Sequence, residues 1–180
     1  MKLNKTSIDG LLLIENFQAE DNRGAFVKTF NRDDFSNNSL NVEWKESYFS
    51  ISHKGTIRGM HFQNPPHDHE KLVYVAKGAI IDVVLDLRSD SNTFSQYEIF
   101  ELNDRNRYSL YIPKGLAHGF MSLEDGTITV YNVSTVYAPE SDNGILYNSF
   151  GYDWNGITKP IISERDLKFQ PFTKFKSPFL

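Results

Sequence analysis

Short runs of apolar residues, many of them β-branched or aromatic, alternate with turn-forming polar residues through the middle of the chain. The runs cover residues 72–76, 79–85, 97–102, 108–112 and 127–133. Strands at this regular spacing, with no helical pattern between them, favour an antiparallel sandwich or barrel over a parallel sheet. We therefore predict an all-β fold, a cupin-like jelly-roll barrel. We also expect the first two runs to pair as a hairpin across Lys77-Gly78.

Helical patterns are few and lie outside this central region. Residues 32–40 are compatible with one short helix. Ser163 is followed three residues later by Asp166, an arrangement that resembles a capping box, so a second short helix can begin there. The composition shows no linker, repeat or shift along the chain. We therefore expect residues 1–180 to form a single domain with short peripheral helices.

Composition and charge narrow the class of partner. A chain of 180 residues, 39% hydrophobic and 14% aromatic, can bury one sizeable core. Its net charge of −4 is unlike the basic surface of a protein that binds nucleic acid or anionic membranes. The absence of cysteine excludes disulfides, thiol nucleophiles and Cys-ligated metal centres. Because no apolar segment has the length of a signal peptide or membrane span, we expect a cytoplasmic protein with neither nucleic-acid nor membrane partners.

The histidines raise the question of a metal site. Pro113-x-Gly115-x-x-His118 resembles the second motif of the cupins, in which this His binds a metal. The first cupin motif is broken, because Lys71 stands where that motif has a Glu, and an ammonium group repels a divalent cation. We therefore predict no metal site. We interpret His53, His67 and His69 as structural, with a metal-dependent cupin that uses His67, His69 and His118 as an alternative.

Basic side chains inside such a barrel would favour an anionic ligand such as a phosphate. The candidates are His61, Lys71, His118 and Arg58. Alternation along a strand places Arg58 and His61 on opposite faces. If both face one pocket, a bulge or bend near Gly59 is required.

Several separated motifs between residues 17 and 166 point to one family. They are Asp21-x-Arg23-Gly24-x-Phe26, Gly55-Thr56-Ile57-Arg58-Gly59-Met60-His61-Phe62-Gln63, Lys71-Leu72-Val73, Asp82-Val83-Val84-Leu85-Asp86-Leu87-Arg88, Ile112-Pro113-x-Gly115-x-Ala117-His118-Gly119-Phe120, Tyr131 with Tyr137-Ala138-Pro139, and Ser163-Glu164-Arg165-Asp166. In order and spacing they resemble the nucleotide-sugar 3,5-epimerases typified by dTDP-4-dehydrorhamnose 3,5-epimerase. The resemblance implies an isomerase without metal or cofactor that acts on a nucleoside-diphosphate 4-keto-6-deoxy sugar. It also implies a homodimer, because family members pair through their sheets and N-terminal strands.

The resemblance also assigns catalytic roles. A C4 ketone acidifies the protons on C3 and C5, so inversion requires a base, stabilisation of an enolate and a proton donor on the opposite face. By resemblance, His61 is the base and Asp166 orients its imidazole. Lys71 would stabilise the enolate, and Tyr131 would return a proton from the far side.

The same resemblance implies a set of substrate-binding residues. Arg23 and Arg58 match contacts to the pyrophosphate, for which the guanidinium fork is suited. His118 matches a residue near the sugar or phosphate. The remaining expected binding residues are Phe26, Glu46, Tyr48 and Tyr137.

The chain departs from the family pattern at Glu46-Ser47-Tyr48, where members commonly have Gln-x-Asn. This change alters the hydrogen-bonding groups offered to a ligand. dTDP is the family default, but GDP, CDP or UDP sugars and inversion of C3 or C5 alone stay open. A non-catalytic sugar-nucleotide-binding cupin is the alternative from a different functional class.

Overall fold

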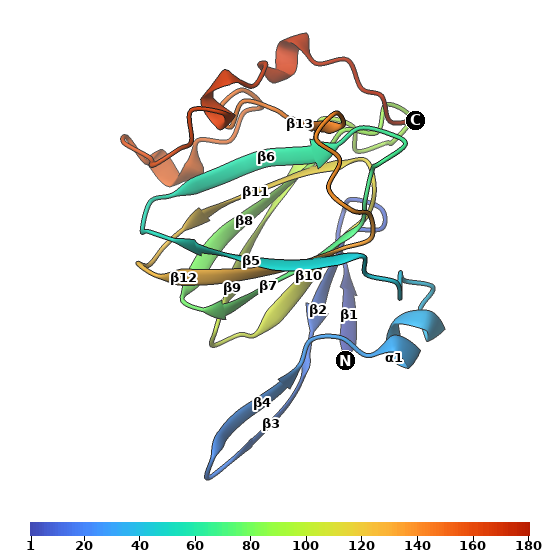
Figure 1. Cartoon of the computed structure of the whole chain (residues 1–180), viewed down its shortest axis with the longest axis vertical. Helices are drawn as coiled ribbons and strands as arrows, with labels where there is room; N and C mark the ends of the chain where they lie inside the picture. Colours follow the sequence, from blue (N-terminus) through green and yellow to red (C-terminus); the bar gives the residue numbers. More distant parts are fainter.

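The structure, a computed structural model that describes residues 1–180, consists mainly of two facing antiparallel sheets (Figure 1). The larger sheet has the order β1 (Lys2–Lys5), β2 (Leu12–Glu15), β10 (Tyr108–Ile112), β7 (Lys71–Lys77), β12 (Thr127–Val133) and β5 (Glu46–Ser52). The smaller sheet has the order β13 (Asp142–Gly144), β6 (Ile57–Gln63), β11 (Leu116–Ser122), β8 (Ala79–Asp86) and β9 (Tyr97–Asn103). The expected all-β, jelly-roll-like fold is confirmed, although the sheets stay separate and do not close into a barrel.

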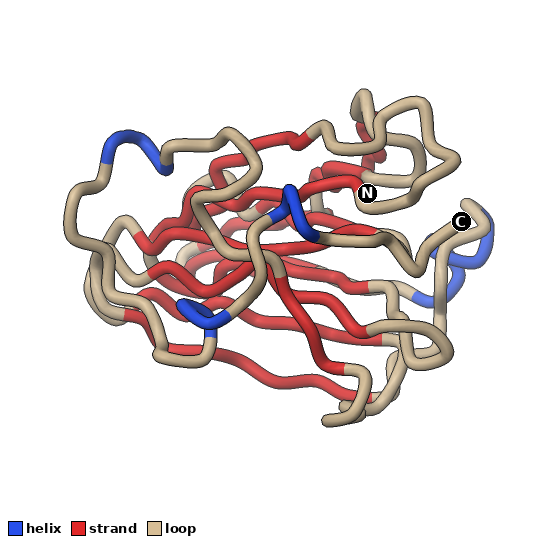
Figure 2. The backbone as a smooth tube through the Cα atoms, turned by 90° about the horizontal axis from the view of Figure 1, so that it is seen from above, coloured by secondary structure: helices blue, strands red, loops and turns tan.

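The main core lies between the two sheets and draws alternate residues from both. Val73 and Val75 of β7 face Ile80 and Val84 of β8 within one buried cluster. The outer face of the smaller sheet is also covered, because residues of the C-terminal segment such as Trp154 pack against it. Burial on both faces explains why β8 is apolar at six of its eight positions and does not alternate. Figure 2 shows the strands running side by side, with turns at their ends and a segment of loops and short helical turns crossing over them.

One predicted pairing is wrong. β7 and β8 follow each other across Gly78, but β7 pairs with β10 and β12 whereas β8 pairs with β9 and β11. Gly78 has a φ of +81°, and a Cβ there would lie 2.5 Å from the Oγ1 of Thr127. Lys77-Gly78 is therefore a corner between two sheets and not a hairpin turn. The local turn signature is the same in both cases, and pairing with distant strands decides between them.

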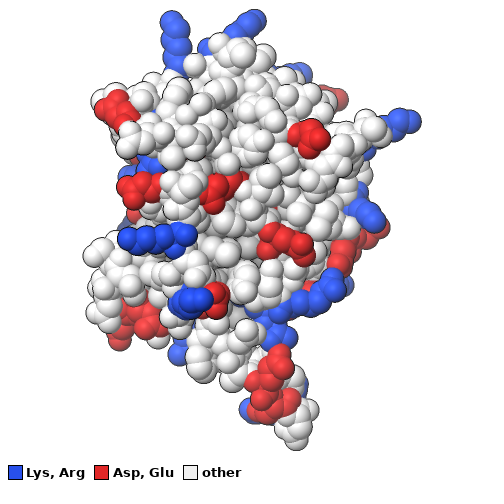
Figure 3. Space-filling view, turned by 180° about the vertical axis from the view of Figure 1, so that it is seen from behind, with Lys and Arg blue, Asp and Glu red and all other residues white.

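Strands β3 (Phe17–Asp21) and β4 (Gly24–Lys28) form a separate hairpin that projects from the body of the molecule (Figure 1). Figure 3 shows the same projection from behind, with acidic and basic side chains close together at its end. Elsewhere on that face, charges of both signs are interspersed, without a continuous basic patch. Almost every residue of the hairpin is exposed, so it contributes little to the core of its own chain.

The helices are short and peripheral, as predicted. α1 (Arg32–Asn37) covers the first part of the expected 32–40 helix, and its Phe35 packs on the outer face of the larger sheet. Three 3₁₀ turns follow late in the chain: η1 (Trp154–Gly156), η2 (Asp166–Lys168) and η3 (Phe172–Lys174). The backbone N–H of Asp166 donates to the Oγ of Ser163 at 3.1 Å, which is one of the two hydrogen bonds of a capping box, although the 3₁₀ turn itself begins only at Asp166. No helix is long and apolar enough to cross a membrane.

Candidate active site

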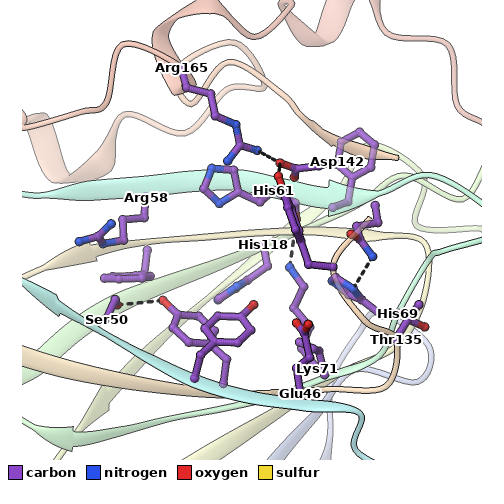
Figure 4. Close-up of a pocket in the computed structure, with 17 residues that line it drawn as sticks. Glu46, Ser50, Arg58, His61, His69, Lys71, His118, Thr135, Asp142 and Arg165 are labelled. Carbon is purple, nitrogen blue, oxygen red and sulfur yellow. Dashed lines mark hydrogen bonds and ion pairs between the residues drawn. The ribbon is translucent and has the colours of Figure 1, made fainter. Parts of the chain in front are cut away.

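A cavity of about 460 Å³ opens between the two sheets (Figure 4). Strands β5, β7 and β12 of the larger sheet line one side, and β6, β11 and β13 of the smaller sheet line the other. This volume lies within the usual range for small-molecule sites in proteins. Because side chains from both sheets enter it, a ligand in the cavity would be contacted from two opposite walls.

Strand β6 brings Arg58 and His61 to the same cavity, although simple alternation would separate them. The pairing of β6 with β11 shifts register between His118 and Phe120, opposite this stretch. Gly59 lies at the shift, and a Cβ there would approach the Cα of Gly119 to 2.5 Å. The irregularity that the sequence required near Gly59 is therefore present.

His61 and Asp166 form the central pair of the site. The Nε2 of His61 lies 2.9 Å from the Oδ1 of Asp166. The other oxygen of Asp166 accepts a hydrogen bond from the Gly59 N–H at 3.3 Å. With Asp166 beside Nε2, the Nδ1 of His61 makes no hydrogen bond to the protein and is the nitrogen that can accept a proton.

Burial and charge set the ionisation of this pair. Burial lowers the pKa of His61, while Asp166 opposes that change by stabilising the imidazolium. Burial alone would raise the pKa of Asp166, but its contacts with His61, Gly59 and Ser163 lower that pKa overall. At neutral pH the site therefore holds a neutral imidazole beside a carboxylate, which is the form a general base requires.

Lys71 and His118 lie deeper in the cavity. The Nζ of Lys71 donates to the backbone oxygen of His61 at 3.2 Å. Burial lowers the pKa of Lys71 to about 8, and the nearby Asp82 and Asp142 oppose that shift. The Nε2 of His118 lies 2.8 Å from the Oδ2 of Asp82, and both side chains are buried. Lys71 is thus a cation held inside the cavity, where developing negative charge is stabilised more strongly than in water.

Tyr131 reaches the cavity from β12, on the wall opposite His61. Its hydroxyl lies 3.3 Å from the Oγ of Ser50, and its ring stacks on Tyr48 with centroids 5.0 Å apart. Burial raises the pKa of Tyr131, so its hydroxyl stays protonated at neutral pH. The pKa of Tyr48 is raised by burial to about 12. A base and a phenolic donor therefore face each other across the cavity.

Other charged side chains line the rest of the cavity. The guanidinium of Arg58 donates to the Oγ of Ser52 at 3.1 Å and to the backbone oxygen of Ile51 at 3.3 Å. In a second cluster, the Nη2 of Arg165 lies 2.6 Å from the Oδ2 of Asp142, which also accepts from the Tyr137 hydroxyl at 3.1 Å. The cavity thus has guanidinium groups that can receive an anionic ligand.

The structure brings most of the predicted site residues together. The cavity is lined by His61, Lys71, Tyr131, Arg58, His118, Glu46, Tyr48 and Tyr137, and Asp166 contacts His61 from behind. Arg23 and Phe26 do not line it, because both lie on the β3–β4 hairpin. There Arg23 pairs with Asp21 at 2.6 Å and Phe26 is 60% exposed.

Some cavity residues were not predicted to belong to the site: Ser50, Gln63, His69, Thr135, Asp142 and Arg165. Gln63 and Arg165 lie inside recognised motifs, so their positions could have been noticed, whereas Thr135 and Asp142 carry no signal in a single sequence. His69 had been interpreted as structural, yet it lines the cavity. His67 contacts the Oγ of Ser141 at 2.8 Å, and the structure contains no group of three or more His, Cys, Asp or Glu side chains placed to hold a metal ion.

An imidazole–carboxylate pair faces a phenol and a buried ammonium across this cavity, which is the arrangement expected of an isomerase that moves protons on carbon. Comparison with known proteins agrees. The family model described as dTDP-4-dehydrorhamnose 3,5-epimerase matches residues 5–174, so the chain belongs to that family, as the motifs predicted.

The similarity extends over nearly the whole chain. The dTDP-4-dehydrorhamnose 3,5-epimerase of Methanothermobacter thermautotrophicus is 40% identical over 171 residues, covering 93% of this chain and 92% of that protein. The dTDP-4-dehydrorhamnose 3-epimerase of Streptomyces niveus is 32% identical, covering 92% and 81%. The crystal structure of the Legionella pneumophila epimerase with dTDP-4-keto-L-rhamnose superposes with a TM-score of 0.94 at 30% identity, covering 99% and 98%.

Proposed function

We propose that this chain inverts C3, C5 or both in a dTDP-linked 4-keto-6-deoxy sugar. The observation that carries the proposal is the position of His61 and Tyr131 on opposite walls of one cavity, with Lys71 between the sheets. Inversion at carbon needs a base on one face of the sugar and a proton donor on the other, and this geometry supplies both. The family relationship supports the same reaction.

In the proposed reaction, Nδ1 of His61 takes the proton from the carbon next to the C4 ketone. The electron pair of the broken C–H bond moves to form an enolate, whose oxygen is stabilised by the Lys71 ammonium. The Tyr131 hydroxyl then delivers a proton to the opposite face of the same carbon. Asp166 holds the imidazole in place and stabilises its protonated form. Transfer of a proton from imidazolium to phenolate, through solvent, restores the starting state.

Isotope exchange tests the reaction directly. The protein is incubated with dTDP-4-keto-6-deoxyglucose in deuterium oxide, and the sugar is followed by NMR. We expect deuterium at C3, at C5 or at both, and the labelled positions identify the carbons that are inverted. Tyr131→Phe should still exchange protons through His61 but should accumulate less inverted sugar. Deuterium at neither carbon, with GDP, CDP and UDP sugars also inert, would overturn the proposal in favour of a non-catalytic binder.

The protruding hairpin supports a homodimer as the active form. Arg23 cannot contact a pyrophosphate in the cavity of its own chain as the hairpin stands, so we assign it to the cavity of a second copy. Exposed apolar side chains on the hairpin and on the edge strand β5 fit an interface between copies; they are Phe17, Phe26, Phe49 and Ile51. A symmetric pair would exchange the two hairpins reciprocally.

Subunit complementation tests this arrangement. Arg23→Ala and Arg58→Ala are each expected to be weak enzymes, because each site would lose one guanidinium contact. When the two variants are mixed and allowed to exchange subunits, a mixed dimer has one site with both arginines. About a quarter of all sites should then be complete, and activity should recover to that extent. No recovery on mixing, with exchange verified by native mass spectrometry, would show that Arg23 does not act across the dimer.

The expected cytoplasmic location, the single-domain organisation and the absence of nucleic-acid or membrane partners stay predictions. The nucleotide also belongs to the proposal. dTDP is the nucleotide carried by the substrate named for the family, whereas Glu46 and Tyr48 replace the amides common among its members. Measuring turnover with the four nucleotide sugars side by side decides the preference.

A further inference from the structure

The amide of Gln63 has only one possible orientation. Its Oε1 accepts a hydrogen bond from the backbone N–H of Ala138 at 2.7 Å. Its Nε2 donates to the backbone oxygen of His67 at 2.7 Å. A backbone N–H can only donate and a carbonyl can only accept, so exchanging the two ends of the amide would break both contacts. Gln63 is itself buried, and water cannot replace either bond.

This fixed amide determines the tautomer of His69. The Nε2 of Gln63 lies 3.2 Å from the Nδ1 of His69. For the second amide hydrogen, Nδ1 is a closer acceptor than the backbone oxygen of Val136, which lies 3.5 Å from Nε2 of Gln63. Nδ1 therefore accepts, and the single proton of the neutral ring resides on Nε2. Burial, reinforced by the nearby charge of Lys71, lowers the pKa of His69 to about 3. His69 is therefore an uncharged donor throughout the physiological range of pH.

The donor has no partner in the protein. Nε2 of His69 is buried and makes no hydrogen bond, although the side chain lines the cavity beside Lys71 (Figure 4). Burying an unpaired N–H costs free energy, so such groups in folded proteins generally have a role or a partner. A ligand oxygen in the cavity would supply that partner.

We infer that His69 is a substrate-binding residue whose Nε2–H donates a hydrogen bond to an oxygen of the bound nucleotide sugar. This inference rests on the proposed function for the identity of the ligand. The fixed tautomer makes the contact selective, because Nε2 can donate but not accept. An oxygen of the sugar or of the diphosphate satisfies it, whereas an ammonium or a C–H group at that point leaves the donor unpaired.

The tautomer is measured in the free protein by two-dimensional ¹H–¹⁵N NMR of the histidine side chains. We expect a His69 ring with its proton on Nε2 and no titration between pH 5 and pH 9. The His69→Gln variant identifies the signals, and exposed His53 serves as an internal reference ring. A proton on Nδ1, or a titration within this range, would overturn the inference. This readout does not depend on any enzymatic activity.

Binding measurements with three proteins test the ligand contact. His69→Leu removes the donor, whereas His69→Gln can accept from Gln63 through its oxygen and donate through its amide. Calorimetric titration with dTDP-glucose should give an affinity about tenfold lower for His69→Leu and largely restored for His69→Gln. His53→Gln should bind like the unchanged protein, and thermal melting confirms that each variant is folded.

Titration with dTDP alone separates the two possible sources of the oxygen. If the loss in His69→Leu also appears with dTDP, the acceptor belongs to the diphosphate or nucleoside. If it appears only with dTDP-glucose, the acceptor belongs to the sugar. Equal affinities of all variants for both ligands would overturn the inference. If the unchanged protein binds dTDP-glucose but catalyses no isotope exchange, the proposed reaction is contradicted, whereas the His69 contact is not.

Discussion

The cavity contains two histidine–aspartate pairs that are nearly identical in distance and very different in surroundings. His61 lies 2.9 Å from Asp166, and His118 lies 2.8 Å from Asp82. The two histidines are direct partners in the ladder between β6 and β11. However, the His61 side chain is 31% exposed, whereas that of His118 is 4% exposed. The two pairs therefore differ in access and not in their contact with a carboxylate, and access is what a base needs in order to reach a substrate.

The two carboxylates also differ in where they come from. Asp82 belongs to β8, the strand next to β11, so its contact with His118 links two strands within one sheet. Asp166 belongs to the η2 turn, outside both sheets, and approaches β6 from behind. Loss of the first pair should therefore affect the stability of the wall, whereas loss of the second should affect proton transfer.

The largest expected effect is on catalysis by His61. His61→Asn removes the proton acceptor and should lower kcat/KM for epimerisation by about 10³-fold, because general-base catalysis contributes on that order. The midpoint of urea unfolding should change little, because Asp166 keeps its hydrogen bond from the Gly59 N–H when the imidazole is lost. Steady-state assays and urea titrations measure the two quantities. A variant with near-normal turnover would show that the exposed histidine is not the base.

The next effect is on stability at His118. His118→Ala leaves the carboxylate of Asp82 buried without its partner and should lower the free energy of unfolding by about 3 kcal/mol. Adding Asp82→Ala should recover part of that loss, since no unpaired charge then remains. Urea unfolding of the single and double variants measures both changes. A double variant less stable than the sum of the single ones would contradict this role.

The dependence of kcat/KM on pH should be the smallest of these effects, because activity changes gradually with each pH unit. His61 must be neutral to accept a proton, and burial lowers its pKa below the usual 6.5, so kcat/KM should decline only in acid below that value. Lys71 must be protonated to stabilise the enolate, and its pKa is lowered to about 8, so activity should also decline above pH 8. Each limb should approach a tenfold change per pH unit.

A variant of Lys71 tests whether this residue causes the decline in activity above pH 8. Lys71→Arg keeps the positive charge at every accessible pH, so any remaining activity should lose its decline above pH 8. If the decline persists in this variant, another group is responsible for it. The acid limb should be the same in both proteins because His61 is unchanged.

Much of the site could be predicted from the sequence because its residues lie in strands whose pattern is local. The strand limits at 108–112 and 127–133 agree with the structure, and the conflict between Arg58 and His61 correctly required an irregularity at Gly59. Ser163 accepts from the Asp166 N–H as predicted, although the prediction did not show how the turn reaches His61. Resemblance to the family supplied that link.

The remaining features depend on contacts between distant parts of the chain. Lys77-Gly78 has a hairpin signature, but the neighbours of each strand lie too far away in sequence for a local pattern to reveal the corner. His69 looks like one polar residue in a loop, and its donor becomes evident only when Ala138 fixes Gln63. Arg23 lies in a recognised motif, yet only the fold shows that it cannot enter the cavity of its own chain.

The position of Asp166 has a consequence for synthesis on the ribosome. The chain emerges with His61 long before the η2 turn that supplies its partner, and the cavity wall formed by β12 also comes late. A nascent chain that has completed β6 thus holds the His61 imidazole without its carboxylate and without β11 and β13, the strands that pair with β6. Proton transfer should therefore begin only after this last segment has left the exit tunnel, which keeps unfinished chains from acting on metabolites.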